Sequence, residues 1–266
     1  MALAVCATPI GNLDDVTLRV LEELRSADVI LCEDTRHTRV LLDRHEISGN
    51  LMSYHEHNEA KRAAELLPRL EAGERFALVS DAGMPAISDP GARLVAAALE
   101  RGVPVTVLPG PTAVDTALVA SGIPAERYQF VGFLPRGARA LASLWEELAA
   151  WPHPVVAFES PRRLPATLRS LADAQPAREV AVCRELTKKF EEVVRGTASD
   201  VATRFAEPPK GEITLVLGPG SPGGDVGEAV EAVAELVSAG VPRRQAADVV
   251  SRLTGAARNE LYRRTL

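Results

Sequence analysis

Cysteine and aromatic residues are scarce in this chain of 266 residues. It has three cysteines, which lie far apart in the sequence, and aromatic residues make up 4% of it. An odd number of widely spaced cysteines offers neither a disulfide framework nor the ligand spacing of a metal site. We therefore expect buried thiols in a reducing compartment, and this predicts a cytoplasmic protein.

Long apolar runs and several common nucleotide and hydrolase motifs are also missing. No apolar run reaches the 18 or more residues of a membrane helix, so we predict no membrane partner. The chain has no G-x-G-x-x-G, no G-x-x-x-x-G-K-[ST] and no G-x-S-x-G, so a Rossmann fold, a P-loop NTPase and an α/β-hydrolase are unsupported. His55 and His57 should point to opposite faces of an extended segment, and without a third ligand they predict no metal site.

Hydrophobic residues are plentiful, at 46% of the chain, which is enough for a packed core. In the first half, short apolar runs alternate five times with helical patterns, and each run ends in a polar or Gly/Pro-rich loop. This alternation predicts an α/β fold with a parallel sheet covered by helices on both faces. The predicted strands are Leu3–Ala7, Val29–Cys32, Leu51–Tyr54, Phe76–Val79 and Val103–Leu108.

The longest of these loops, between Val79 and Leu94, dominates the pattern. It contains two Asp, two Gly and two Pro, whereas most strand-to-helix connections need only 2–6 residues. We expect Ser88 or Asp89 to cap the following helix, with Pro90 in its first turn. Ligands of open α/β sheets bind beyond the carboxyl ends of the strands, so a ligand is expected here.

Two further loops share this character, at 8–12 and at 109–113. All three follow a strand and are rich in small residues, so backbone groups can approach a ligand closely. None contains Lys or Arg in its turn, which argues against a polyphosphate. The pattern favours a small, weakly charged ligand, such as an adenosyl sulfonium compound, without selecting one.

The second half of the chain predicts two further units. Strands are expected at Val155–Phe158, Val180–Cys183 and Ile213–Leu217, and Gly/Pro-rich residues over 219–224 look like a linker. Three helices then follow in a helix-turn-helix-like pattern. We predict domains at 1–134, 135–220 and 221–266.

Several motifs together closely resemble the tetrapyrrole methylase family. They are T-P-I-G-N at residue 8, D-A-G-M-P-A-I-S-D-P-G at residue 81 and L-P-G-P-T-A at residue 108. Further stretches, C-E-D-T-R-H-T, S-Y-H-E-H-N-E, F-E-S-P-R-R and C-R-E-L-T-K-K-F-E, resemble the branch that methylates small-subunit ribosomal RNA. The first loop differs from the more Gly-rich loop of tetrapyrrole-modifying members.

The resemblance implies two α/β domains with a cofactor cleft between them, plus a small C-terminal helical unit. It also implies S-adenosylmethionine as cofactor and a homodimer. The residues implied to bind the cofactor are Pro9, Gly11, Ser80, Asp81, Ala82, Gly83, Ser88, Asp89, Pro109, Gly110, Pro111, Thr112, Ala113, Phe158, Glu159, Ser160, Gly211, Glu212 and Ile213.

The implied reaction is methylation of the ribose 2′-hydroxyl of a cytidine in the decoding region of 16S rRNA. In-line positioning of oxygen, methyl carbon and sulfur supplies much of the rate, and a general base can add more. The candidate bases are Glu33, Asp34, His55, Glu159, Glu185 and Lys188, among which we favour Glu33, Asp34 or Glu159. The alternative for these carboxylates is that they pair with Arg36, Arg162 or Arg163.

The partner predicted for this reaction is 16S rRNA in the small ribosomal subunit. Although the net charge is −6, residues 134–210 and 241–266 have a local basic excess, which steers polyanions. Tyr54 and Phe190 could stack an unpaired base, and the basic tail either grips RNA or packs on the body. The residues proposed to contact RNA are Arg36, Arg162, Arg163, Arg184 and Lys188.

Two other functions remain open from the sequence. One is a tetrapyrrole methylase acting on a precorrin or uroporphyrinogen, which the Arg-rich loops and basic tail disfavour. The other is an RNA-binding or ribosome-assembly module with a vestigial cofactor fold, which the three intact loops disfavour.

Overall fold

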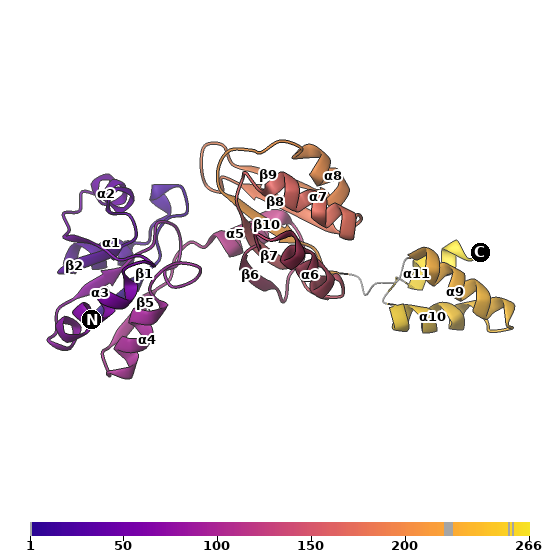
Figure 1. Cartoon of the computed structure of the whole chain (residues 1–266), viewed down its shortest axis with the longest axis horizontal. Coiled ribbons are helices and arrows are strands. Elements are labelled where there is room, and N and C mark those ends of the chain that lie inside the picture. Colours follow the sequence, from indigo (N-terminus) through magenta and orange to yellow (C-terminus); the bar gives the residue numbers. More distant parts are fainter. Residues whose placement is uncertain (1, 221–225, 255, 257) are drawn as a thin grey trace. The chain divides into compact units, whose positions relative to one another are not determined.

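The computed structural model describes residues 2–220, 226–254, 256 and 258–266 (Figure 1). These residues form two α/β domains and a set of C-terminal helices, which confirms the predicted fold class. None of the described helices is long and apolar enough to cross a membrane. The predicted linker over 219–224 lies mostly outside the described residues.

The first sheet has five strands in the order β3-β2-β4-β1-β5. Every pairing in it is parallel, as the alternating pattern predicts. Because the strands are parallel, all five carboxyl ends, and the loops that follow them, lie along one edge. The strands are β1 (Leu3–Cys6), β2 (Val29–Cys32), β3 (Leu51–Ser53), β4 (Phe76–Leu78) and β5 (Val105–Leu108).

Helices cover both faces of this sheet. Alternate residues of one strand point to opposite faces, so Leu3 and Val5 join one hydrophobic cluster, and Ala4 and Cys6 join the other. The first cluster contains residues of α3 and α4, and the second contains residues of α1 and α2. These helices are α1 (Leu18–Ser26), α2 (Thr35–Arg44), α3 (Glu59–Glu71) and α4 (Ala92–Glu100).

The start of α4 differs from the prediction. Its N-cap is Gly91, with φ of 134° and no side-chain cap, and not Ser88 or Asp89. A Cβ at position 91 would lie 2.7 Å from Leu78 Cδ2. Close packing of this turn against β4 therefore requires glycine and moves the helix start past both expected caps.

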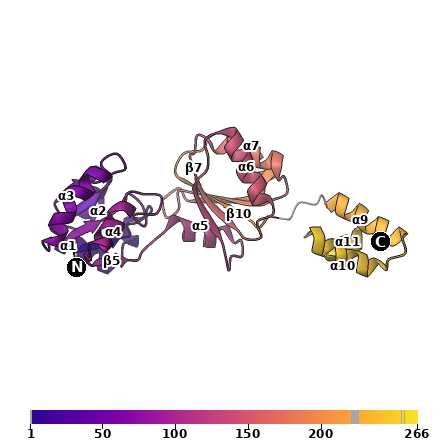
Figure 2. The same cartoon turned by 60° about the horizontal axis from the view of Figure 1, so that its bottom comes forward.

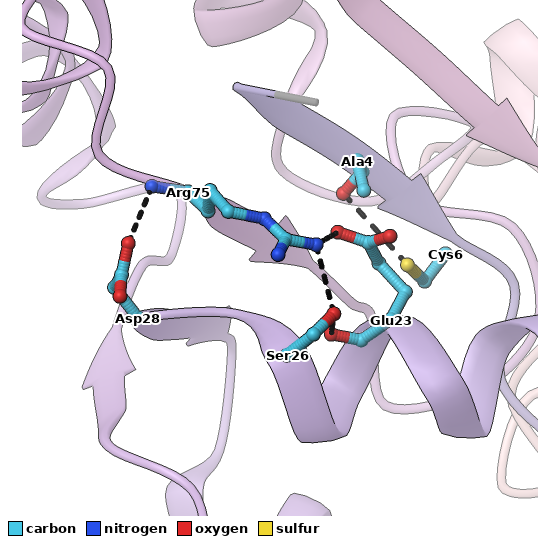
Figure 3. Close-up of polar contacts among 6 residues, drawn as sticks. All are labelled: Ala4, Cys6, Glu23, Ser26, Asp28 and Arg75. Carbon is cyan, nitrogen blue, oxygen red and sulfur yellow. Dashed lines mark hydrogen bonds and ion pairs between the residues drawn. The ribbon is translucent and has the colours of Figure 1, made fainter.

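A polar cluster around the buried Glu23 fastens α1 near the amino-terminal ends of β2 and β4 (Figure 3). Arg75 Nη2 lies 3.3 Å from Glu23 Oε1 and donates to Ser26 Oγ at 2.8 Å. The Arg75 backbone N–H donates to Asp28 Oδ2 at 2.9 Å. Glu23 is only 5% exposed, so a charge on the inner face of α1 depends on Arg75 for its partner.

The second sheet has the order β6-β7-β10-β8-β9. It is mixed, since β6 pairs with β7 in parallel and β10 pairs with β7 antiparallel. Residues of three helices, including the fully buried Trp145, pack with the sheet in one cluster, and Figure 2 shows α6 and α7 together on this sheet. The elements are β6 (Gln129–Phe133), β7 (Val155–Glu159), β8 (Glu179–Arg184), β9 (Glu192–Thr197), β10 (Ile213–Leu217), α6 (Ala138–Ala149), α7 (Leu164–Ala174) and α8 (Ala198–Arg204).

Three C-terminal helices share a hydrophobic core of their own. They are α9 (Val226–Ser238), α10 (Arg243–Thr254) and α11 (Arg258–Arg264). Val233, Val250 and Leu261 are among the buried residues of this core. The sequence predicts a break between the last two helices at Gly255, and this residue lies outside the described residues.

The chain divides into two compact units by its internal contacts, Met1–Ala117 with Arg184–Glu192, and Leu118–Cys183 with Val193–Leu266. The segment 184–192 leaves β8 and returns to β9, yet it belongs to the first unit. The domain limits predicted at 134 and 220 stay predictions.

Candidate functional site

Three of the loops predicted to bind a ligand come together at the carboxyl edge of the first sheet. Thr8 and Gly83 exchange backbone hydrogen bonds of 2.8 and 3.1 Å, and Thr8 Oγ1 donates to the Ser80 carbonyl at 3.0 Å. A Cβ on Gly83 would lie 3.5 Å from Ile10 Cγ2 and 3.6 Å from the Pro111 carbonyl oxygen. Residues 8–12, 80–91 and 109–113 therefore meet around Gly83, because β1 lies between β4 and β5 in the sheet.

The loop after β5 packs tightly on the loop after β1. A Cβ on Gly110 would lie 2.8 Å from Ala7 Cβ, so only glycine allows this approach. Thr112 Oγ1 donates to Asp115 Oδ2 at 2.5 Å and accepts the Asp115 N–H at 3.1 Å. The Thr112 hydroxyl is thus occupied by hydrogen bonds at the start of α5 (Ala113–Ser121). The backbone of Pro109–Thr112 forms the turn that leads from β5 into this helix.

The long loop after β4 has an unusual backbone. Ala86 and Ser88 have φ values of 67° and 62°, and Gly83 and Gly91 also have positive φ. Left-handed conformations of residues other than glycine are costly and concentrate at functional sites. This loop is therefore a shaped surface, with Ala82 and Ser88 exposed and Ser80 buried within it.

A pocket of about 470 Å³ opens beside these loops, at the carboxyl ends of β2, β3 and β4. Two consecutive acids, Glu33 and Asp34, follow β2, and Asp81 follows β4. Asp81 Oδ1 accepts the Asp34 backbone N–H at 3.2 Å, which ties the two loops together. The pocket is lined by Glu33, Asp34, Thr35, Arg36, Ser53, His55, His57 and Asp81.

The carboxyl groups in and beside this pocket differ in acidity. Partial burial, followed by the charge of Asp81, raises the pKa of Glu33. Burial and the charge of Glu33 raise the pKa of Asp89 to about 6. The Arg36 side chain and backbone donate to Asp34 and lower its pKa to about 2. Glu33 and Asp89 are thus the carboxyls that bind protons most readily here.

The prediction that His55 and His57 point to opposite faces of an extended segment is wrong. His55 and His57 line the same pocket, with ring centroids 5.9 Å apart, and do not point to opposite faces. The reason is that β3 ends at Ser53, and residues 56–58 form a turn. His55 Nδ1 is buried and has no hydrogen-bond partner among the described residues. Ser53 and His57 were missed as pocket residues, although the place of Ser53 at the end of β3 and of His57 shortly after it was a usable signal.

The second unit brings together the other residues implied to bind the cofactor. In the β7–β10 pairing, Ile213 faces Glu159 and Thr214 faces Phe158. The Phe158–Ser160 stretch therefore lies beside the turn of Lys210, Gly211 and Glu212, where Gly211 has φ of 96°. Phe158 packs edge-to-face against Phe130 and Phe133, with centroids 5.0 and 5.5 Å apart.

Glu159 has every sign of a structural carboxylate. Its residue is 2% exposed, and its oxygens accept from the Ser160 N–H at 2.6 Å and from Thr167 Oγ1 at 2.5 Å. Arg163 Nη2 lies 3.2 Å from Glu159 Oε2. The carboxylate–arginine pairing that the sequence left as an alternative is thus present here and at Asp34–Arg36, 2.7 Å apart.

The residues proposed to contact RNA fall into three groups. Arg163 points inward and donates to the carbonyls of Leu134 at 2.9 Å and Pro135 at 2.6 Å, whereas Arg162 is exposed. The others pair with nearby acids: Arg36 with Asp34, Arg184 with Glu192 at 3.0 Å, and Lys188 with Glu185 at 3.0 Å.

Two family models together match almost the whole chain. Residues 2–202 match the model of the Tetrapyrrole (Corrin/Porphyrin) Methylases, and residues 224–266 match the RsmI C-terminal HTH domain. Among curated relatives, the ribosomal RNA small subunit methyltransferase I of Mesorhizobium japonicum is 43% identical over 268 residues, which cover 100% of this chain and 91% of the relative. The enzyme of the same name from Thermotoga maritima is 47% identical over 219 residues, covering 81% of this chain and 97% of the relative.

Solved structures show the same fold at lower identity. Cobalt precorrin-4 methyltransferase has a TM-score of 0.60 at 20% identity, covering 81% of this chain and 94% of that one. Uroporphyrin-III C-methyltransferase from Thermus thermophilus, complexed with S-adenosyl homocysteine, has a TM-score of 0.58 at 22% identity, covering 81% and 96%.

Proposed function

Because this chain belongs to the tetrapyrrole methylase family, we propose that it transfers the methyl group of S-adenosylmethionine to small-subunit ribosomal RNA. The acceptor is the ribose 2′-hydroxyl of a cytidine in the decoding region of 16S rRNA. The observation that supports this best is 43% identity over the full chain to a ribosomal RNA small subunit methyltransferase I. The structures named for tetrapyrrole substrates are only 20–22% identical.

The residues of the first unit suit a cationic cofactor. S-adenosylmethionine supplies an electrophilic methyl group on a positively charged sulfonium. The three loops that meet at Gly83 contain no Lys or Arg. Besides burial, the charge of Asp81 raises the pKa of Glu33, and the charges of Glu33 and Asp81 raise the pKa of Asp89. Such mutual repulsion between carboxylates is relieved by a nearby cation. Backbone groups of the loops at 8–12, 80–91 and 109–113 would hold the cofactor.

Glu33 is the carboxylate best suited to act as general base. It lines the pocket, and burial and the charge of Asp81 raise its pKa above the ordinary value, which makes it a stronger base than an ordinary carboxylate. Asp34 has a pKa of about 2, and so it is a weak base. Glu159 is buried with both oxygens engaged, and so it cannot reach a substrate hydroxyl.

The roles of Glu33 and Asp34 can be separated by isosteric amides. We expect Glu33→Gln to lower turnover roughly 10²- to 10⁴-fold, the range for a general base, a far larger loss than the change in cofactor affinity that calorimetry measures for the same variant. Asp34→Asn is the matched control next in sequence, and it should keep most of the turnover. Equal losses in both variants would remove Glu33 from this role.

The substrate is tested by methyl transfer. Small ribosomal subunits, naked 16S rRNA and uroporphyrinogen are each incubated with labelled S-adenosylmethionine, and nucleosides from the RNA are separated by mass spectrometry. We expect label only in RNA, as 2′-O-methylcytidine. Label in uroporphyrinogen alone would establish a tetrapyrrole methylase. A calorimetric titration with S-adenosylmethionine that gave no heat would argue against a methyltransferase of either kind.

The proposal extends to a cytoplasmic homodimer. Val107 on the edge strand β5 is 54% exposed, and Phe133 on the edge strand β6 is 63% exposed. Edge strands with exposed apolar side chains favour association. Light scattering should therefore give twice the chain mass of 28.4 kDa, and a Phe133→Lys variant should shift the molecule toward monomer.

A further inference from the structure

The segment 184–192, which connects β8 to β9, is a strained strap. Glu185 and Thr187 have φ values of 52° and 65°. For a β-branched residue such as Thr187 this conformation is an outlier and persists only where surrounding contacts enforce it. Two such residues in a short segment indicate that its shape matters.

Contacts with the loop after β1 enforce this shape. Thr187 Oγ1 accepts the Asn12 N–H at 2.9 Å, and the Thr187 N–H donates to Glu191 Oε2 at 2.6 Å. A Cβ on Gly11 would lie 2.5 Å from Lys188 Cγ and 2.8 Å from the Leu186 carbonyl oxygen. The strap therefore lies directly on a loop that is implied to bind the cofactor.

The acidic side chains of the strap form ion pairs or hydrogen bonds with other residues of the strap. Glu185 pairs with Lys188, Glu192 pairs with Arg184, and Glu191 accepts the N–H of Thr187. The residues of the strap exposed to solvent are Lys189, Phe190 and Glu191. Phe190 is 65% exposed, and the Lys189 ammonium lies 5.6 Å from the centroid of its ring.

An exposed aromatic ring flanked by a cation is the combination that binds unpaired nucleotides. The ring stacks on a base of any sequence, and the cation attracts the phosphate. Of the two aromatics suggested by the sequence for stacking, Tyr54 is 1% exposed and donates to Glu59. Tyr54 therefore belongs to the core, and Phe190 is the ring available to a ligand.

We propose that Phe190 and Lys189 form a platform for an unpaired RNA base, held rigidly against the loop after β1 by the strap. The inference rests on the proposed function and names the residues by which that function would hold single-stranded RNA. Because the strap contacts Gly11 and Asn12, a base stacked on Phe190 is held at a fixed place relative to the cofactor loop.

The test measures binding of a fluorescently labelled, unstructured RNA oligonucleotide to the full chain. Phe190→Leu keeps an apolar side chain but removes the stacking face, and we expect its affinity to fall roughly tenfold or more. Phe190→Tyr should bind like the parent chain. Leu18→Ala is the matched control, since Leu18 is 84% exposed and lies on α1. Affinity for duplex RNA should not change in any of these variants.

Lys189 is tested separately. Lys189→Gln should reduce the slope of log affinity against log salt concentration by about 1, as expected for one lost phosphate contact. The platform would be overturned if the Phe190→Leu and Leu18→Ala variants bound the oligonucleotide with equal affinity. It would also be overturned if the parent chain did not bind RNA. If the parent chain binds RNA and Phe190→Leu weakens it, but no methyl is transferred, the platform stands and the proposed function fails.

Discussion

At the scale of single residues, neighbours decide what a carboxylate can do. Three acids offered as bases by the sequence differ only in their surroundings. Burial and the charge of Asp81 raise the pKa of Glu33, Arg36 lowers the pKa of Asp34, and hydrogen bonds occupy Glu159. The sequence names the acids, but what each acid can do depends on the groups that fold against it.

Asp89 should make stability depend on pH. Its pKa in the folded protein is about 6, above the ordinary value near 4. The folded chain thus holds a proton that the unfolded chain has lost, and so the free energy of unfolding falls as pH rises from about 4 to about 6. Asp89→Asn removes this loss. Denaturant titrations should show the variant gaining roughly 1–2 kcal/mol over the parent chain between about pH 4 and pH 7. A gain independent of pH would contradict the assignment.

Gly11 should tolerate no side chain. Its Cβ would lie 2.5 Å from Lys188 Cγ and 2.7 Å from Thr187 Oγ1, so Gly11→Ala must displace the strap. We expect a loss of about 1–3 kcal/mol in the free energy of unfolding, as for other overpacked sites, measured in urea. Gly137→Ala is the control, because no atom lies within 4 Å of its Cβ. Equal stability of the two variants would show that the strap yields freely.

At the scale of elements, packing shifts helix ends away from the best local signals. Thr17 caps α1 by accepting the Val20 N–H, whereas the nearby Asp14 and Asp15, residues that also favour helix N-caps, lie in a separate 3-10 turn. Gly91 likewise begins α4. Helix existence follows from apolar spacing, but the first residue follows from what the turn before it must contact.

The Glu23–Arg75 cluster predicts a stability difference within α1. Glu23→Ala leaves Arg75 without its carboxylate, and we expect about 1–3 kcal/mol of destabilisation. The control is Glu22→Ala, next in sequence but exposed, which should stay within about 0.5 kcal/mol of the parent chain. Urea titrations measure the free energy of unfolding of both variants. Similar losses in the two would mean that the Glu23–Arg75 pair does not stabilise the fold.

At the scale of the whole molecule, each part has its own core. The first sheet is covered on both faces, the second packs with three helices, and the C-terminal helices pack around Val233 and Leu261. A separate core indicates that the C-terminal helices fold independently of the two sheets.

Ending the chain after Gly220 tests this independence. We expect the shortened protein to keep its thermal midpoint and its heat of binding to S-adenosylmethionine, while its affinity for small ribosomal subunits falls. Calorimetry and a binding assay measure these quantities. A drop of several degrees in the midpoint would show instead that the helices pack on the body, the alternative left open by the sequence.

The sequence predicts the α/β class, the five strands of the first sheet and the loops that follow them. Apolar periodicity and Gly/Pro breaks are local signals, so a single chain suffices to read them. It also placed the acids Glu33, Asp34 and Asp81 at strand ends, where the pocket is found.

Only the tertiary structure decided which of these residues meet. Strand order places β1 between β4 and β5 and so gathers three loops around Gly83. The segment 184–192 joins the first unit although its flanking strands belong to the second sheet, and Tyr54 is buried while Phe190 is exposed. Such contacts join residues up to 175 positions apart, and local periodicity holds no information about them.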